Sequence, residues 1–149
     1  QRAAQLGMQD TRFVEATGLS ADNRSSASDL VRLMNAASGH EVIRAYSTAK
    51  ESLVPVGSDE RLVHFRSTNG LIGNPDWEIS LQKTGYIAAA GRCLVMQAQM
   101  AGRRLTMVLL DSAGRYSRFG DAERIRKWLV ATTSAGTLSA AGPSMAPSR

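Results

Sequence analysis

The sequence has few of the residues that build metal sites, disulfides or membrane anchors. Cys93 is its only cysteine, and His40 and His64 are its only histidines. A single cysteine excludes an internal disulfide, and these three residues match no usual zinc-ligand spacing. No apolar run reaches the roughly 18 to 20 residues that cross a bilayer. We therefore expect no metal, no cofactor and no transmembrane helix, and a buried, unreactive Cys93 inside an apolar stretch.

Acidic residues are in the minority, and the chain carries a formal net charge of +5. Much of the excess lies between residues 92 and 127, where eight arginines and lysines accompany only Asp111, Asp121 and Glu123. Such a region indicates either a polyanion partner or a solvated basic face. Neither a recognition motif nor interleaved aromatic residues accompany the charge, so we expect no nucleic-acid partner. A solvated basic face is also compatible with peripheral association with an anionic wall or membrane.

Helices are expected early in the chain. Ser26 and Asp29 have the spacing of a capping box, and Gly39 is placed to end the helix that follows. Its apolar residues recur at helical spacing, namely Leu30, Leu33, Met34 and Ala37. A short helical piece over residues 41–46 and a short strand over 62–65 are expected next, separated by Pro55 and Gly57.

Three strands and a helix are expected in the second half. Residues 77–86 alternate as a strand should, with Ile79, Leu81 and Lys83 predicted on one face. Residues 93–100 and 105–110 form a hairpin pattern. The second of these runs is apolar on both faces, as in a sheet covered on both sides. A final helix is expected to begin at Asp121, with three residues on its apolar face and an ion pair from Glu123 to Lys127; the apolar three are Ile125, Trp128 and Leu129.

This order of elements predicts an α/β (α+β) fold, an antiparallel sheet flanked by helices. We place one domain at residues 1–131. Residues 132–149 are mostly Ser, Thr, Ala, Gly and Pro, and we expect a disordered tail there. The chain opens at Gln1 in what looks like the end of a helix, so we expect it to be part of a longer polypeptide.

The strand over residues 77–86 runs into Lys83-Thr84-Gly85. A cation, a hydroxyl and a residue without a side chain suit a ligand that is a carboxylate-bearing peptide. Lysine offers charge, threonine a hydrogen bond, and glycine room for a second backbone. Lys-Thr-Gly is also one of three motif elements of the penicillin-recognising serine enzymes.

The flanking sequence resembles the low-molecular-mass penicillin-binding proteins, the family of D-alanyl-D-alanine carboxypeptidases and DD-endopeptidases. The resemblance covers roughly residues 6–130. It rests on residues 6–13, 16–20, 25–30, 67–69, 81–86, 90–95, 108–112 and 120–122. Gln-Lys-Thr-Gly-Tyr followed by Ala-Gly-Arg-Cys-Leu is most similar to the endopeptidase branch.

The resemblance implies the C-terminal part of a β-lactamase/transpeptidase-like fold. It also implies a serine D,D-peptidase that cuts peptidoglycan peptides through an acyl-enzyme, in a bacterial envelope, periplasmic or secreted. Lys83, Thr84 and Gly85 would bind substrate, and β-lactams would inhibit covalently. The catalytic Ser-x-x-Lys and Ser-x-Asn elements would lie upstream of residue 1. We therefore expect no catalytic residue in this chain, inactivity when it is alone, and an N-terminal segment of the same protein as its partner.

Three segments imitate the upstream motifs. Residues 47–50 and 80–83 both fit Ser-x-x-Lys, and residues 67–69 fit Ser-x-Asn. We reject the two Ser-x-x-Lys segments because serine and lysine must lie one helical turn apart for the amine to reach the hydroxyl. The stretch from Lys50 to Ser67 is also shorter than the helical half of the family's cleft should require. Ser80 and Lys83 are expected on a strand, and Ser47 near a helix end. A serine β-lactamase and a non-catalytic peptidoglycan-binding module remain alternatives.

Overall fold

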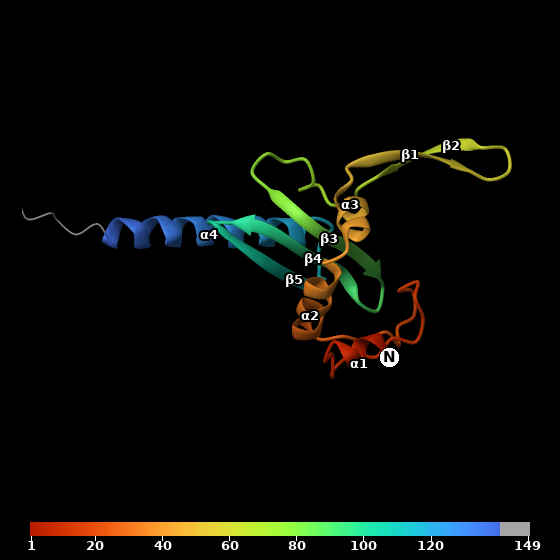
Figure 1. Ribbon diagram of the computed structural model, residues 1–149, viewed down its shortest axis with the longest axis horizontal. Coiled ribbons are helices and arrows are strands. Elements are labelled where there is room, and N and C mark those ends of the chain that lie inside the picture. The colour runs from red at the N-terminus through yellow and green to blue at the C-terminus, as the bar shows by residue number, and fades with distance from the viewer. Residues whose placement is uncertain (141–149) are drawn as a thin grey trace, which may run out of the picture.

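The computed structural model describes residues 1–140 and has a mixed α/β architecture, which confirms the predicted fold class. Its centre is an antiparallel sheet of three strands in the order β3-β4-β5. The strands are β3 (Glu78–Ile87), β4 (Gly91–Met100) and β5 (Arg103–Ser112). The helix α4 (Ser117–Ala140) lies along one face of this sheet and continues past its edge (Figure 1).

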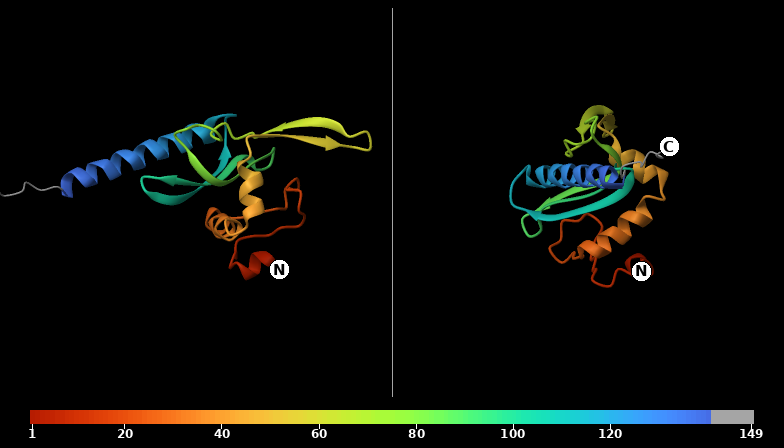
Figure 2. Two further views of the ribbon diagram at one scale, coloured as in Figure 1. Left: turned by 45° about the horizontal axis from the view of Figure 1, so that its top comes forward. Right: turned by 90° about the vertical axis from the view of Figure 1, so that its left-hand side faces the viewer.

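The N-terminal helices lie on the opposite side of the sheet (Figure 2). They are α1 (Arg2–Gln5), α2 (Ala27–Ala37) and α3 (Glu41–Thr48). Ser26 is the N-cap of α2 as predicted, because its Oγ accepts from the Asp29 backbone N–H at 3.2 Å. The Asp29 carboxylate is buried and accepts from the Asp10 N–H and the Thr11 hydroxyl, both at 2.8 Å. This carboxylate therefore fastens the preceding loop to α2.

A second sheet is a hairpin of β1 (Glu51–Val56) and β2 (Arg61–Arg66) that projects away from the body of the molecule (Figures 1 and 2). The sequence pattern predicts β2 but not β1, because Pro55 was expected to interrupt the chain. Proline has no N–H to donate, yet it is tolerated in a strand whose N–H side is unpaired. Pro55 lies opposite Leu62 in this two-stranded ribbon.

The hydrophobic core lies between the three-stranded sheet and α4. Leu94, Met96 and Ala98 point from β4 into this layer and are completely buried, as is Ala122 of α4. Other members are Leu71, Trp77, Met100 and Met107, with Ile79, Leu105, Leu109, Phe119, Ile125 and Leu129 packed around them. The hairpin between β4 and β5 turns at Ala101 and Gly102, both with positive φ, as a two-residue turn of this kind requires.

The predicted alternation along β3 is wrong at its centre. The register shifts between Ile79 and Leu81, so Ser80 is the extra residue of a β-bulge. Ile79 pairs with Ala98, and Thr84 pairs with Leu94, so both lie on the core face. Leu81 and Lys83 follow the bulge on the opposite face. A one-residue insertion reverses which side chains face the core. The alternating sequence pattern contains no signal for this β-bulge.

The start of α4 also differs from the prediction. The helix begins at Ser117, so Asp121 lies inside it and pairs with Arg124 instead of capping. Ile125 and Leu129 pack on the core as expected, whereas the Trp128 side chain is 65% exposed. Glu123 pairs with Arg126, not Lys127, and accepts a hydrogen bond from Trp77 Nε1. Phe119, in the first turn, supplies the core contact that moves the helix start upstream.

The end of α4 lies beyond the residue at which a tail was predicted to begin. The helix continues through Ala140, nine residues beyond residue 131. Alanine favours helix and no proline interrupts before Pro143, so the low charge of this segment does not end the helix. Residues 141–149, the remainder of the predicted tail, lie outside the described residues. Within residues 1–140 no helix combines the length and apolarity needed to cross a membrane.

The loop over residues 12–24 is organised by the Glu15 carboxylate. This carboxylate accepts from the Thr17 hydroxyl, from the Gly18 N–H at 3.0 Å and from the Ser20 N–H at 3.1 Å. The Thr17 hydroxyl, followed by the Ser20 N–H, lowers the pKa of Glu15 from 4.5 to about 2. The pKa falls because these hydrogen bonds stabilise the ionised carboxylate relative to the protonated form.

We predict that this loop loosens as the pH falls from about 4.5 toward 2. A depressed carboxyl pKa contributes stability above the ordinary pKa, and protonation removes that contribution. The protection of the Gly18 and Ser20 amides against hydrogen exchange, corrected for intrinsic rates, should fall over this range. Glu15→Gln should abolish the pH dependence, whereas Glu60→Gln on the projecting hairpin should leave it unchanged. Constant protection in the unsubstituted protein would contradict the prediction.

Candidate functional site

Lys83, Thr84 and Gly85 lie on an edge strand of the central sheet. Their strand, β3, pairs with β4 on one side, and its other side pairs with no strand among residues 1–140. An unpaired strand edge presents backbone N–H and C=O groups that can accept another extended chain. The site is therefore an exposed backbone edge with a cation and a hydroxyl on it.

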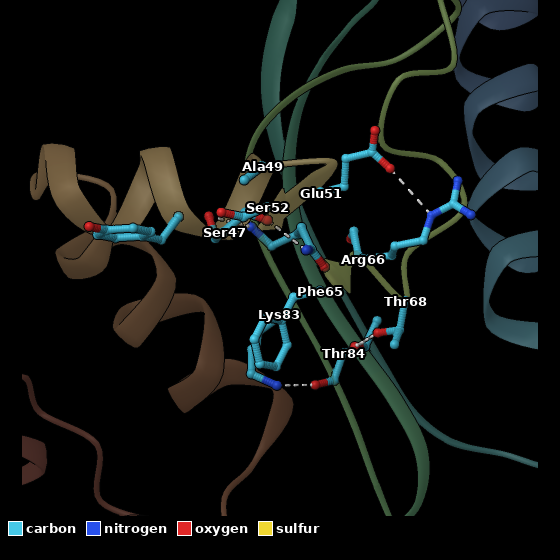
Figure 3. Close-up of a pocket in the computed structure, with 12 residues that line it drawn as sticks. Ser47, Ala49, Glu51, Ser52, Phe65, Arg66, Thr68, Lys83 and Thr84 are labelled. Atoms are coloured by element: carbon cyan, nitrogen blue, oxygen red, sulfur yellow. Dashed lines mark hydrogen bonds and ion pairs between the residues drawn. The ribbon is translucent and has the colours of Figure 1, made fainter. Parts of the chain in front are cut away.

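A groove of about 310 Å³ runs beside this edge (Figure 3). One wall is Gln82, Lys83 and Thr84 of β3, and the others come from the end of α3 and from the base of the projecting hairpin. The lining residues on those walls are Tyr46, Ser47, Ala49, Glu51, Ser52, Phe65, Arg66, Ser67 and Thr68. At the hairpin wall Arg66 Nε lies 3.4 Å from a Glu51 carboxylate oxygen.

The charge of Lys83 is available to a ligand. The Lys83 side chain is exposed, and its Nζ donates to the backbone oxygen of Thr84. Among the described residues it makes no ion pair with a carboxylate. A lysine whose charge is not already neutralised can attract an anionic group into the groove.

Thr84 shares its hydroxyl with a neighbouring segment. Thr68 Oγ1 and Thr84 Oγ1 are 2.6 Å apart, close enough for a strong hydrogen bond in which either can donate (Figure 3). Thr68 belongs to residues 67–69, which imitate Ser-x-Asn in the sequence. No pattern in the sequence indicates this contact, because the two threonines are 16 positions apart.

Gly85 is not required by the chain's own geometry. Its φ is not positive, and a Cβ built there would meet no atom within 4 Å. Neither backbone strain nor packing within the described residues therefore explains a glycine at this position. Close approach of a second backbone, from a ligand or another segment, is the remaining physical use of the missing side chain.

The two Ser-x-x-Lys segments lack the geometry of a catalytic pair. Ser47 is in the last turn of α3, but the helix ends at Thr48 and Ala49 is extended, so Lys50 lies outside it. The Ser47 hydroxyl donates to the Arg44 carbonyl at 3.1 Å and accepts from the Gln82 N–H at 3.4 Å. Ser80 lies at the β-bulge of β3. Residue 69 of the Ser-x-Asn imitation is 1% exposed and its amide is used inside the protein.

Arg118 is a candidate site residue that the sequence analysis did not include. It lies in the first turn of α4, is only 6% exposed, and has no hydrogen-bond partner for its Nε among the described residues. Burial, followed by the nearby charge of Arg92, lowers the pKa of Arg118. Cys93, which lies near enough to Arg118 to influence this pKa, is directly opposite Gly85 on the neighbouring strand β4. With the helix expected to begin at Asp121, no sequence signal marked Arg118.

Other predicted site features fall elsewhere. Cys93 is half-buried in β4, and its thiol lies 3.4 Å from the Ala90 carbonyl oxygen. His64 is half-exposed and lies 3.2 Å from a Glu51 carboxylate oxygen on the hairpin. Within residues 1–140 no cluster of His, Cys, Asp and Glu side chains is placed to hold a metal ion.

Comparison with known proteins gives consistent matches. The family model described as D-alanyl-D-alanine carboxypeptidase matches residues 1–114. The chain is 41% identical over 128 residues to the D-alanyl-D-alanine endopeptidase of Escherichia coli K12, and 43% identical over 128 residues to that of Pseudomonas aeruginosa. Each alignment covers 86% of this chain but 41% of the relative. The chain thus spans about two fifths of the length of these relatives.

Solved structures resemble the fold over most of the chain. The Streptomyces K15 DD-transpeptidase matches with a TM-score of 0.76 at 25% identity, covering 87% of this chain and 51% of the other. Penicillin-binding protein D2 from Listeria monocytogenes, in a cefotaxime-bound form, matches with a TM-score of 0.69 at 28% identity. That alignment covers 85% of this chain and 51% of the other.

Proposed function

This chain belongs to the D-alanyl-D-alanine carboxypeptidase family, and we propose that it forms the substrate-binding part of a serine D,D-peptidase of peptidoglycan. The observation that carries the proposal is Lys83-Thr84-Gly85 on an unpaired strand edge beside a groove. Relatives named D-alanyl-D-alanine endopeptidase, at 41% and 43% identity, favour cleavage of cross-links over trimming of stem peptides.

The proposed reaction is acyl transfer. A serine hydroxyl attacks the carbonyl carbon of a D-alanyl peptide bond, the C–N bond breaks, and the amine leaves with a proton. Water then attacks the acyl-enzyme ester and releases the carboxylate and the serine. We infer that the serine comes from sequence outside residues 1–149, because neither Ser-x-x-Lys segment here holds serine and lysine one helical turn apart.

The residues of β3 would bind and orient the substrate. The free edge of the strand would pair with the extended peptide backbone, which is binding by β-augmentation. Lys83 would supply positive charge to the substrate carboxylate, and Thr84 would donate a hydrogen bond to it. Gly85 would leave room for the peptide backbone. Arg118, buried near Cys93 and without a carboxylate partner in the described residues, would add positive potential at the same end of the strand.

Partners and location follow from this function. A substrate in the cell wall would place the protein in the bacterial envelope, where its net charge of +5 would suit contact with anionic wall or membrane surfaces. β-Lactams would acylate the same serine, and the cefotaxime-bound structure of the Listeria relative supports this class of inhibitor. A polypeptide supplying the rest of the family fold would be the structural partner of this chain.

Labelled penicillin tests the proposal. The full-length gene product that contains residues 1–149 should form a covalent, slowly hydrolysed adduct, and residues 1–149 alone should form none. The full-length product should also cut cross-linked peptide dimers faster than it releases D-alanine from stem peptides. Rapid hydrolysis of the adduct would favour a β-lactamase, and no adduct with the full-length product would favour a non-catalytic binding module.

A further inference from the structure

We propose that Thr68 is a positioning residue for the ligand-binding hydroxyl of Thr84. The inference rests on the proposed function, and it gives a role to residues 67–69, which imitate Ser-x-Asn without forming a catalytic motif. Its basis is the 2.6 Å separation between the two threonine hydroxyl oxygens at the wall of the groove.

Buried amides hold the segment that carries Thr68 against β3. Asn69 is 1% exposed, and its side-chain amide donates to Gln82 Oε1 at 3.4 Å and accepts from the Leu71 N–H at 3.0 Å. Gln82, 8% exposed, donates in turn to the Ser47 carbonyl at 2.6 Å. These contacts connect α3, β3 and the segment in one buried network.

A backbone bond completes the attachment at the other side of Thr68. The Ser67 N–H donates to the Lys50 carbonyl at 2.8 Å, so residues on both sides of Thr68 are fixed. Thr68 itself is exposed, and its hydroxyl reaches Thr84 across the groove wall. The segment is therefore held in place without the Thr68 hydroxyl, which leaves that hydroxyl available for a role at the site.

Hydroxyl chemistry then fixes the direction of the hydrogen bond when a ligand is bound. A threonine hydroxyl has one hydrogen and two acceptor lone pairs. If Thr84 donates its hydrogen to a ligand oxygen, it can only accept from Thr68, so Thr68 must be the donor. In the ligand-free protein the same contact, with either hydroxyl as the donor, would hold Thr84 Oγ1 in one side-chain rotamer, which lowers the ordering cost of binding.

The test is a double-mutant cycle in the full-length gene product. Thr68→Val, which keeps the shape of the side chain and removes the hydroxyl, should reduce the second-order rate of penicillin acylation about three- to tenfold, the size of one hydrogen bond. Thr68→Ser should restore the rate. In a Thr84→Val background, Thr68→Val should have no further effect, because Thr68 acts only through Thr84.

A structural readout separates positioning from stability. Thermal unfolding should be unchanged by Thr68→Val, while three-bond couplings of Thr84 in the ligand-free protein should shift toward averaged side-chain rotamers. Thr132→Val, on the exposed part of α4, is the matched control and should alter neither quantity. An unchanged acylation rate together with unchanged Thr84 rotamers in Thr68→Val would overturn this inference and leave the proposed function intact. A full-length protein that penicillin never acylates would overturn the inference and the proposed function together.

Discussion

Replacement of Lys83 by methionine in the full-length gene product is expected to slow covalent labelling by penicillin about 100-fold, the scale of losing one well-placed electrostatic contact in an active site. Lys83 is exposed, lines the groove and makes no ion pair with a carboxylate in the described part of the chain. Removal of the Lys83 charge should therefore weaken penicillin binding and slow acylation, while the free energy of unfolding should change little. Lys83→Arg, which keeps the charge and alters its geometry, should give an intermediate rate.

Lys50→Met is the matched control for this experiment. It removes the same side chain close to the same groove, and it also tests the segment that imitates Ser-x-x-Lys. Because Lys50 lies beyond the end of α3, its loss should leave the labelling rate within about twofold of the starting value, as for most surface substitutions. Abolished labelling in Lys50→Met would instead identify Ser47 and Lys50 as the reactive pair. Unchanged labelling in Lys83→Met would contradict the role given to Lys83.

Residues 1–149 produced alone are expected to self-associate through β5. The outer edge of this strand pairs with no strand among residues 1–140, and it carries apolar side chains that include the 42% exposed Leu110. An apolar, unpaired edge is a template for pairing with another chain. Light scattering after size-exclusion chromatography should show oligomers or aggregates at micromolar concentrations.

A charge on the edge should suppress this association. Leu110→Lys should return the isolated chain toward a monomer, because a lysine on an edge strand blocks edge-to-edge pairing. Leu53→Lys on the projecting hairpin, where the leucine is 62% exposed, is the matched control and should leave the association unchanged. A monodisperse monomer of the unsubstituted chain would argue against the need for a partner strand at β5.

Short-range signals in the sequence were sufficient for much of the fold. The N-cap at Ser26, the hairpin between residues 93–100 and 105–110, and the strand around Lys83 all depend on neighbours a few positions away. Propensity and periodicity report such local preferences. The position of Lys83-Thr84-Gly85 on a strand could therefore be predicted before its surroundings were known.

The features that were missed depend on contacts between distant residues. The bulge at Ser80 shows only in the pairing of β3 with β4, and Trp128 is exposed because the core takes Phe119, Ile125 and Leu129 instead. Likewise, Thr68 meets Thr84 across 16 positions of sequence. The bulge, the exposure of Trp128 and the Thr68–Thr84 contact are all set by tertiary packing. Local propensity and periodicity in the sequence do not report such packing.

The core between the sheet and α4 is rich in methionine, a residue that oxidants attack. All five methionines in the described residues are buried, and Met96, Met100 and Met107 belong to the layer between the sheet and α4. Thioethers adapt their shape well, which suits a sheet interrupted by a bulge. Oxidants convert them to polar sulfoxides that such a layer cannot accommodate. In the folded protein these five thioethers are shielded from solvent, whereas oxidation of the unfolded chain by peroxide would prevent the core from packing again.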